Sequence, residues 1–353
     1  MKKTLILQVN PQNPDPSKIQ AAAEIIKSGG LVAFPTETVY GLGADALNAK
    51  AVLALFAAKN RPLDNPPILH IADAEQIYPL IKEAPENAGV LMERFWPGPL
   101  TLIFKRSQTV PKETTAGLDT VAIRMPKHKV ALALIRQSGK AIAAPSANLS
   151  GKPSPTSAKH VYSDLNGRID AIIDAGDTNI GVESTVLDLS VDPPVVLRPG
   201  GTPFESIAQV LSNVKLHPFV NAEKEVALVH ARSPGMLHKH YAPNAQVVLV
   251  EGDVSAVIFK INSLTQQYRS EGKKVGVLAT DETLNRYSPD VVESMGSRFN
   301  LESIAKNLFR QLREFDNQTV DIILAEGVPL EGLGLAVMNR LRKASGYHII
   351  KAE

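Results

Sequence analysis

Helical segments alternate with short apolar runs along almost the whole chain, and this alternation limits the possible folds more than any other feature. The first helix is expected from Ser17, which can cap its start, to the Gly29-Gly30 pair, and an apolar run at 31–34 follows. Further helices are expected at 49–58 and 88–95, and further strands at 68–71, 100–104, 121–123, 141–144, 171–173, 185–189 and 195–197. The pattern predicts a layered α/β domain. Because the last two runs are spaced like a hairpin, we expect its sheet to be mixed.

A break in this pattern divides the chain. Between about Gly200 and Ala245 the periodicity weakens, and prolines interrupt it at 203, 218, 234 and 243. Beyond the break, Asn300 can cap a helix, and the expected elements are strands at 247–250, 275–279 and 320–324 and helices at 254–268, 301–315 and 335–341. A chain of 353 residues is long enough for two domains. We therefore predict a first domain at 1–206, a linker at 207–244 and a smaller α/β domain at 245–353.

Composition excludes several kinds of chemistry. The sequence has no cysteine, so disulfides, thiolate nucleophiles and cysteine-bound zinc or iron–sulfur centres are impossible. The eight histidines show no metal-binding spacing, and we expect no metal at His238 and His240. The net charge of +2 argues against a polycationic nucleic-acid coat protein. The N-terminal apolar run is too short for a signal peptide and no stretch is long enough to span a membrane, so we expect a cytoplasmic protein without a membrane partner.

Polar side chains follow several expected strands of the first domain. The segment 35–43, Pro-Thr-Glu-Thr-Val-Tyr-Gly-Leu-Gly, brings Thr36, Thr38 and Tyr40 to one strand end. The segment 143–154 brings further hydroxyls and an amide to another strand end, and the segment 181–185 opens a strand. In open α/β sheets, ligands bind beyond the carboxyl ends of the strands. These segments are therefore candidates for contact with a small polar ligand. For 35–43, an ordinary turn with capping hydroxyls is the alternative.

Several cations lie where a phosphate or carboxylate could bind. Lys59 and Arg61 straddle a helix end, where arginine offers a planar fork and lysine a point charge. Arg124 and Arg198 each end a strand. The alternatives are compensation of the helix dipole for the first pair and solvated rim charges for the second; His70, inside an apolar strand, could be a core histidine. The three polar segments, the Lys59–Arg61 pair and these two arginines in one domain favour an anion pocket.

Four of these segments, in this order, carry a family resemblance. Residues 35–43, Lys59-x-Arg61, Ser146-x-Asn148 and 181–185 resemble the signature of the YrdC-type L-threonylcarbamoyladenylate synthases, over about residues 15–206. The linker motifs at 233–236 and 240–243 and the second α/β domain resemble the long, two-domain branch of that family. The resemblance implies a first domain with a twisted, open, mostly parallel sheet, and a smaller domain of Rossmann-like type.

The resemblance also implies an activity. A nucleotidyltransferase of this family makes threonylcarbamoyl-AMP and pyrophosphate from L-threonine, bicarbonate and ATP, with Mg²⁺ held mainly by the phosphates and no dedicated protein metal site. A separate tRNA threonylcarbamoyl transferase would then transfer the threonylcarbamoyl group to adenosine 37 of tRNAs that read codons beginning with A. Direct contact of this chain with tRNA stays open.

Family roles carried onto the matching positions give two sets of contacts. Threonine would be bound by Thr38, His70, Arg124, Ala144 and Ser184. ATP would be bound by Arg61, Asn65, Thr120, Ser146, Asn148, Ser154, Arg198 and Tyr241. Lys59 and Arg61 would act as the catalytic pair by neutralising charge as pyrophosphate leaves. The linker would form a lid, with Tyr241 folding back over the nucleotide.

Two other functions fit parts of the sequence. Residues 94–140 contain nine Lys and Arg but only Glu113 and Asp119 as acids, a bias that an RNA-binding module without catalysis would use. Aromatic residues for base stacking are few, at 5% of the chain. The related domain of hydrogenase-maturation carbamoyltransferases also adenylates a carbamoyl group, but those larger proteins carry cysteine-rich zinc modules that this chain lacks.

Overall fold

A computed structural model of the chain describes residues 3–224 and 241–353 and divides them into two compact units. Among the described residues, unit 1 consists of 3–150 and 154–220, and unit 2 consists of 151–153, 221–224 and 241–353. The linker motif at 233–236, together with His238 and His240, lies outside the described residues.

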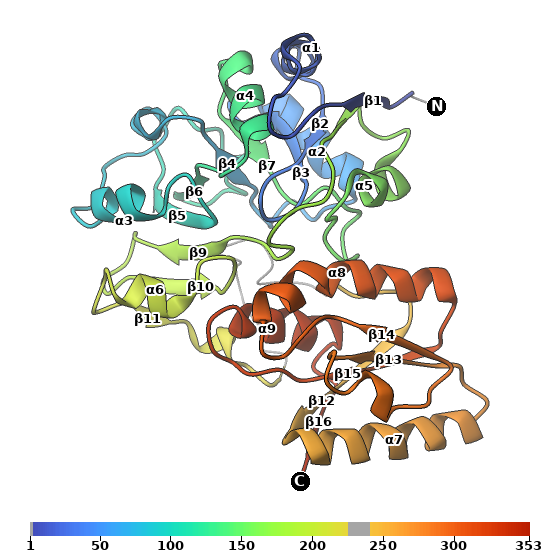
Figure 1. Cartoon of the computed structure of the whole chain (residues 1–353). Coiled ribbons are helices and arrows are strands. Elements are labelled where there is room, and N and C mark those ends of the chain that lie inside the picture. The colour runs from blue at the N-terminus through green and yellow to red at the C-terminus, as the bar shows by residue number, and fades with distance from the viewer. Residues whose placement is uncertain (1–2, 225–240) are drawn as a thin grey trace. The chain divides into compact units, whose positions relative to one another are not determined.

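Unit 1 is built on a single twisted sheet (Figure 1). Its described strands are β1 (Leu5–Gln8), β2 (Val32–Phe34), β3 (Gly41–Asp45), β4 (Ile68–His70), β5 (Leu100–Lys105), β6 (Thr120–Arg124), β7 (Ile142–Ala144), β8 (Ala171–Asp174), β9 (Thr185–Asp188), β10 (Val195–Arg198) and β11 (Lys215–Leu216). Their order in the sheet is β1-β8-β2-β3-β7-β4-β6-β5-β9-β10-β11. The pairs β1–β8, β8–β2, β4–β6, β5–β9 and β10–β11 are parallel, and the other pairs are antiparallel. The predicted α/β fold with a mixed sheet and a β9–β10 hairpin is confirmed, although parallel pairs are no majority.

The sheet has fewer parallel pairs than expected, in part because β3 was not among the expected strands. It lies between β2 and β7 and is antiparallel to both. A Cβ added at Gly43 would lie 2.7 Å from a side-chain carbon of Ile142 and 2.9 Å from one of Phe34. This glycine therefore serves close packing between strands, which a sequence pattern cannot distinguish from a loop.

Helices cover both faces of the sheet. The described α-helices of unit 1 are α1 (Pro16–Lys27), α2 (Ala49–Lys59), α3 (Ala88–Phe95), α4 (Lys129–Ser138), α5 (Ala158–Leu165) and α6 (Phe204–Ala208). Val32 and Phe34 belong to the apolar core under α1 and α4, whereas Leu31 and Ala33 belong to the core under α2 and α5. Successive residues of one strand thus point to opposite faces, and both faces are buried.

The start of α1 corrects one prediction. Its cap is Asp15, whose carboxylate accepts the backbone N–H of Ser17 at 2.9 Å and that of Lys18 at 3.4 Å. Pro16 fills the first helical position, where its missing N–H costs nothing. Ser17 is therefore inside the helix, and the expectation that it is the cap was wrong.

The sheet of unit 1 includes a strand from the first part of the expected linker, 207–244. β11 pairs in parallel with β10, and Ile207 and Val214 are buried in the same core as Leu187 and Val196. Residues 207–220 therefore belong to unit 1. The helix α6 has five residues and β11 has two, so neither is long enough to show a period in the sequence.

Unit 2 contains a smaller sheet, with α-helices α7 (Val254–Ser270), α8 (Leu301–Gln318) and α9 (Gly334–Ala344). The strands are β12 (Gln246–Gly252), β13 (Val275–Ala279), β14 (Val291–Ser294), β15 (Ile322–Glu326) and β16 (Ile349–Ala352). All pairs are parallel, in the order β14-β13-β15-β12-β16, which confirms a second α/β domain. When the strands are numbered 1 to 5 within unit 2, their order in the sheet is 3-2-4-1-5. The usual sheet of dinucleotide-binding domains has the order 3-2-1-4 instead. Asn300 caps α8 as predicted, by accepting the N–H of Ser303.

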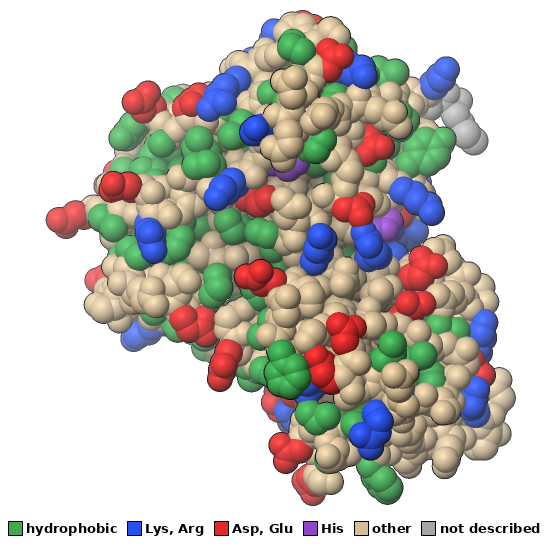
Figure 2. All heavy atoms as spheres, in the orientation of Figure 1, with side chains coloured by type: hydrophobic (Ala, Val, Ile, Leu, Met, Phe, Trp, Pro, Cys, Tyr) green, Lys and Arg blue, Asp and Glu red, His purple; other side chains and the backbone are tan. Residues whose placement is uncertain are grey.

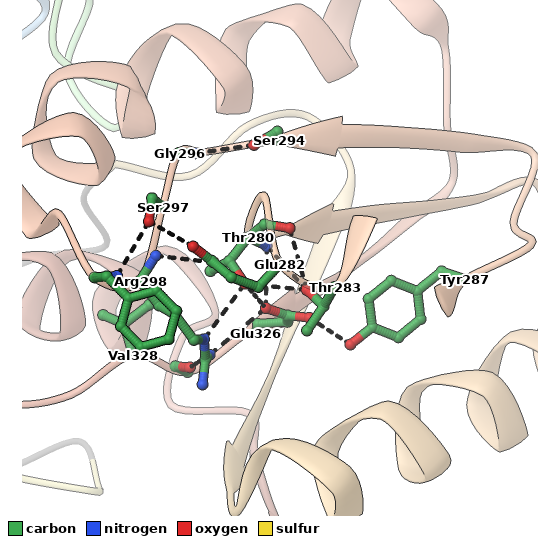
Figure 3. Close-up of polar contacts among 12 residues, drawn as sticks. Thr280, Glu282, Thr283, Tyr287, Ser294, Gly296, Ser297, Arg298, Glu326 and Val328 are labelled. Atoms are coloured by element: carbon green, nitrogen blue, oxygen red, sulfur yellow. Dashed lines mark hydrogen bonds and ion pairs between the residues drawn. The ribbon is translucent and has the colours of Figure 1, made fainter. Parts of the chain in front are cut away.

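A buried polar network closes the carboxyl edge of this second sheet (Figure 3). Glu326, at the end of β15, accepts the backbone N–H and the hydroxyl of Thr280, both at 3.0 Å, and the hydroxyl of Tyr287. Arg298 lies 3.7 Å from the same carboxylate. Burial and the Glu326 charge raise the pKa of Tyr287, which keeps this phenol a donor. The network ties the segment after β13 to β15 and is satisfied internally.

No helix within the described residues is long and apolar enough to cross a membrane.

Candidate active site

Three of the polar segments meet through backbone hydrogen bonds. The N–H of Tyr40 donates to the carbonyl of Pro155 at 2.9 Å, and the N–H of Ala147 donates to the carbonyl of Tyr40 at 2.8 Å. The N–H of Gly181 donates to the carbonyl of Thr38 at 3.1 Å. Residues 36–40, 145–150, 154–155 and 180–184 thus form one polar region of unit 1, although they lie far apart in the sequence.

Arg124 ends β6 within this region, where its guanidinium contacts three groups. Nη1 donates to the hydroxyl of Thr38 at 2.9 Å, and Nε donates to the carbonyl of Gly98 at 3.0 Å. Nη2 lies 2.7 Å from a carboxylate oxygen of Glu37. Arg124 is only 3% exposed, so the solvated rim charge considered from the sequence is wrong.

His70 lies beside Arg124, because β4 and β6 are parallel and these two residues are register partners. Burial, with the charge of Arg124 as a second cause, lowers the pKa of His70 to about 3. Its Nδ1 lies 3.1 Å from the carbonyl oxygen of Ile68. The ring is therefore neutral at physiological pH. Ala144 of β7 is the register partner of Ile68, so its small side chain lies on the neighbouring strand.

The low pKa of His70 predicts a pH-dependent stability. The unfolded ring has an ordinary pKa near 6.5, so between about pH 6.5 and 3 the unfolded chain binds a proton that the folded chain does not. The free energy of unfolding that depends on the neutral His70 ring is fully present above pH 6.5. It is lost on acidification, by up to about 1.4 kcal/mol per pH unit. His70→Gln should therefore lose less stability than the parent between pH 7.5 and 5. Urea unfolding followed by the fluorescence of Trp96 in unit 1 measures this, and parallel losses would contradict it.

Arg198 and Ser184 are brought together by the β9–β10 hairpin. The Arg198 guanidinium donates to the carbonyl of Ser184 at 2.8 Å from Nη2, and Nη2 lies 3.2 Å from the Ser184 hydroxyl. That hydroxyl is also 2.8 Å from the hydroxyl of Thr101. A Cβ at Gly200 would come within 2.3 Å of the backbone at Glu183 and Ser184, so only glycine fits this turn.

Lys59 ends α2 and holds the segment that carries Ser146 and Asn148. Its side chain is 1% exposed, and its ammonium donates to the carbonyls of both residues. Asn60 adopts a left-handed conformation, with φ of 51°, and this ends the helix and turns the chain. The position of Lys59 is therefore fixed by a buried contact, beyond compensation of the helix dipole.

Arg61 and Asn65 shape the turn that follows. Arg61 Nε donates to the carbonyl of Asn65 at 2.9 Å. The amide of Asn65 is 1% exposed, and neither its oxygen nor its nitrogen has a hydrogen-bond partner in the structure. A buried polar group left unpaired costs about 1–3 kcal/mol, which makes this amide a candidate for contact with a ligand. Thr120 begins β6 and lines a small cavity with Pro66 and Pro67, which follow Asn65.

Two expected nucleotide contacts have different surroundings. Ser154 is fully buried and donates to a carboxylate oxygen of Glu183 at 2.5 Å, next to Ser184. Tyr241 belongs to unit 2, where its ring stacks on Phe309 with a centroid distance of 5.2 Å. Its expected contact with a nucleotide in unit 1 stays a prediction.

Sequence reasoning missed the acidic partners of the site. Glu37 and Glu183 are 5% and 6% exposed and contact Arg124 and Ser154. Both lie inside segments that the sequence singled out, at 35–43 and 181–185. In each segment the sequence shows a single acidic residue among hydroxyl side chains. No local pattern indicates which cation or hydroxyl such a residue contacts in the fold.

The basic bias of residues 94–140 is largely offset by ion pairs. Carboxylates lie within 4.0 Å of five of its nine cations, in the pairs Lys105–Glu83, Arg106–Asp119, Arg124–Glu37, Arg136–Asp73 and Lys140–Asp45. On the face in Figure 2, blue and red side chains are interspersed and form no continuous basic patch. This arrangement gives no support to an RNA-binding module.

Comparisons with known proteins identify the family of this chain. A family model for the Sua5, YciO and YrdC proteins, described as "telomere recombination", matches residues 24–200, and one described as "Threonylcarbamoyl-AMP synthase, C-terminal domain" matches residues 203–346. The chain belongs to the Sua5/YrdC family. The predicted family and its two-domain branch are thereby confirmed.

Full-length relatives of this family are closely similar. Proteins named threonylcarbamoyl-AMP synthase are 55% identical in Pyrococcus abyssi, over 99% of both chains, and 52% identical in Bacillus subtilis, over 96% of this chain and 95% of that protein. The crystal structure of P. abyssi Sua5 complexed with L-threonine matches with a TM-score of 0.95 and 54% identity, covering 99% of this chain and all of the other.

Proposed function

We propose that this protein is a threonylcarbamoyl-AMP synthase that uses L-threonine, bicarbonate and ATP and releases pyrophosphate, which makes it a nucleotidyltransferase. The observation that carries this proposal is the 55% identity, over the full length of both chains, to a protein of that name. The polar region of unit 1 supports it, because buried cations and hydroxyls meet there at the strand ends where α/β sheets bind ligands.

Arg124 is proposed to bind the α-carboxylate of threonine. An arginine fork presents parallel N–H groups that match the two oxygens of a carboxylate. Thr38 and Ser184 are proposed to bind the remaining polar groups, because both hydroxyls are buried beside an arginine. His70 is neutral and therefore adds no charge to this subsite. The threonine complex of the P. abyssi protein supports an amino-acid subsite of this kind.

The ATP subsite is proposed around Lys59, Arg61 and Arg198, with Asn65, Thr120, Ser146, Asn148 and Ser154. Transfer of a nucleotidyl group needs in-line positioning and stabilisation of charge on the leaving phosphates, and cations fixed by buried hydrogen bonds provide both. The attacking group would be the carbamate oxygen made from threonine and bicarbonate, so no protein nucleophile is required.

Mg²⁺ is proposed to enter with ATP. Within residues 3–224 and 241–353 there is no group of three or more His, Asp or Glu side chains that could hold a metal ion. The ion would be bound mainly by the phosphate oxygens of ATP, whose negative charge it would neutralise. The product is proposed to serve a transferase that modifies tRNA in the cytoplasm.

The deciding assay measures ATP conversion to AMP-level products and pyrophosphate with each small substrate withheld in turn. Turnover should require both threonine and bicarbonate. Equal turnover of ATP without threonine would reject the proposed function, whichever products ATP gives.

Arg61→Ala should weaken the use of ATP. The loss in transition-state stabilisation should be roughly 2–5 kcal/mol, the range for truncating one partner of a buried charged contact. Steady-state kinetics with ATP varied at saturating threonine measure it. Arg136→Ala is the control, because Arg61 follows the C-cap of α2 and Arg136, in the last turn of α4, is likewise a helix-end arginine but pairs with Asp73 at 3.1 Å, away from the site. Equal kinetics for both variants would show that Arg61 is only a helix-end charge.

A further inference from the structure

The threonine subsite contains a buried acid that none of the expected contacts uses. Glu37 and Arg124 form an ion pair in which both side chains are less than a tenth exposed. Removing two charges from water is expensive, and apolar residues of the same volume often stabilise a protein as well or better. A stabilising role therefore gives a weak explanation for this pair, and a functional role a stronger one.

We propose that Glu37 is a positioning residue for substrate recognition: its carboxylate fixes the Arg124 guanidinium so that remaining N–H groups can bind the α-carboxylate of the amino acid. This inference rests on the proposed function, because it takes L-threonine as the ligand of Arg124.

The hydrogen bonds of Arg124 support this role. A guanidinium has five N–H groups. Nε–H donates to the carbonyl of Gly98 and Nη1 donates one N–H to Thr38. Nη2 contacts Glu37 at 2.7 Å, but the pair is not aligned as a hydrogen bond. Glu37 thus holds Nη2 by charge, and N–H groups on both terminal nitrogens remain for a bidentate carboxylate.

The backbone around Glu37 fixes the acid itself. The carbonyl of Glu37 accepts the N–H of Ile180 at 2.8 Å, and the carbonyl of the next residue, Thr38, accepts that of Gly181. The hydroxyl of Thr36 accepts the N–H of Thr38 at 3.2 Å. Both neighbours of Glu37 are therefore held, so the carboxylate is aimed at Arg124 by a rigid turn before any ligand binds.

Glu37→Gln tests the proposal, because it keeps the size of the side chain and removes its charge. Isothermal titration would compare L-threonine with L-threoninol, which lacks the carboxylate. We expect the affinity of the variant for threonine to fall roughly 30-fold, at the low end of the effect of breaking a buried charge pair. Its affinity for threoninol should change little, and the KM for ATP should stay the same.

Asp45→Asn is the matched control, because Asp45 is another buried carboxylate, 3.1 Å from Lys140, outside the site. It should leave both affinities unchanged. Thermal melting of each variant checks the fold. If Glu37→Gln does not fold, Glu37→Asp retains the charge but is shorter by one methylene, and it should also weaken threonine binding selectively.

Three results would overturn the proposal. Equal losses for threonine and threoninol would show that Glu37 acts on another part of the ligand or on the fold. An unchanged affinity for threonine would show that Arg124 is oriented without it, and a tighter affinity would show that Glu37 competes with the substrate for Arg124. If the parent protein binds no threonine, the proposed function fails together with this inference, which distinguishes that case from the other three.

Discussion

Arg124→Ala should abolish threonine-dependent turnover, with kcat/KM for threonine reduced roughly a thousandfold or more, at the upper end of the cost of truncating a buried charged contact. The substitution removes the proposed carboxylate fork and also leaves Glu37 buried without its cation. Titration with L-threonine in the absence of nucleotide separates lost binding from slower chemistry. Arg124→Lys should recover little activity, because a lysine keeps the charge but not the planar fork.

Two controls make this result specific. Arg106→Ala removes another largely buried arginine, which donates to the carbonyl of Val110 at 2.8 Å, and it should leave threonine binding intact. Thermal melting distinguishes an unfolded protein from a folded one that cannot bind. Near-normal threonine affinity in folded Arg124→Ala would contradict the proposed subsite.

Lys59→Met should impair both stability and the use of ATP. The ammonium of Lys59 satisfies the carbonyls of Ser146 and Asn148, and each buried acceptor left unpaired costs about 1–3 kcal/mol. The free energy of unfolding should therefore fall by about 2–6 kcal/mol. Because the same segment carries proposed nucleotide contacts, kcat/KM for ATP should fall roughly 100-fold, within the range for losing a buried charge.

The two effects can be measured separately. Urea unfolding followed by Trp96 fluorescence gives the stability, and kinetics below the transition give the ATP effect. Lys50→Met, on an exposed lysine of the same helix, should change neither. Normal ATP kinetics with reduced stability would show that Lys59 only holds the segment 146–148.

Several parts of the fold follow from local pattern. The helices α3 and α8 and the strands β5 and β13 lie within a few residues of their predicted bounds, because their apolar periodicity is strong. Asn300 caps α8 as expected, whereas Asp15 instead of Ser17 caps α1, because side chains two residues apart can compete for one helix start. Strand β3 was missed because glycines that allow close packing resemble loop glycines.

In the candidate site, too, some features were predictable from local sequence and others were not. The order of four segments predicted the family, and the types of residue predicted which chemistry to look for. Partners across the sheet were not predictable, because the pairing of His70 with Arg124 depends on the register of β4 and β6. The pairing of Arg124 with Glu37 depends on a turn that is held by residues 180 and 181.

The sequence by itself determined the α/β class, the two-domain organisation and the polar segments of the first domain to which the site belongs. These depend on periodicity, on residue type and on the order of motifs, which are all local properties of the chain. Only the tertiary structure decided which acid faces which cation, that His70 stays neutral, and that Lys59 is bound to two carbonyls. Those properties arise from burial and from contacts between segments far apart in the chain, so no local pattern contains them.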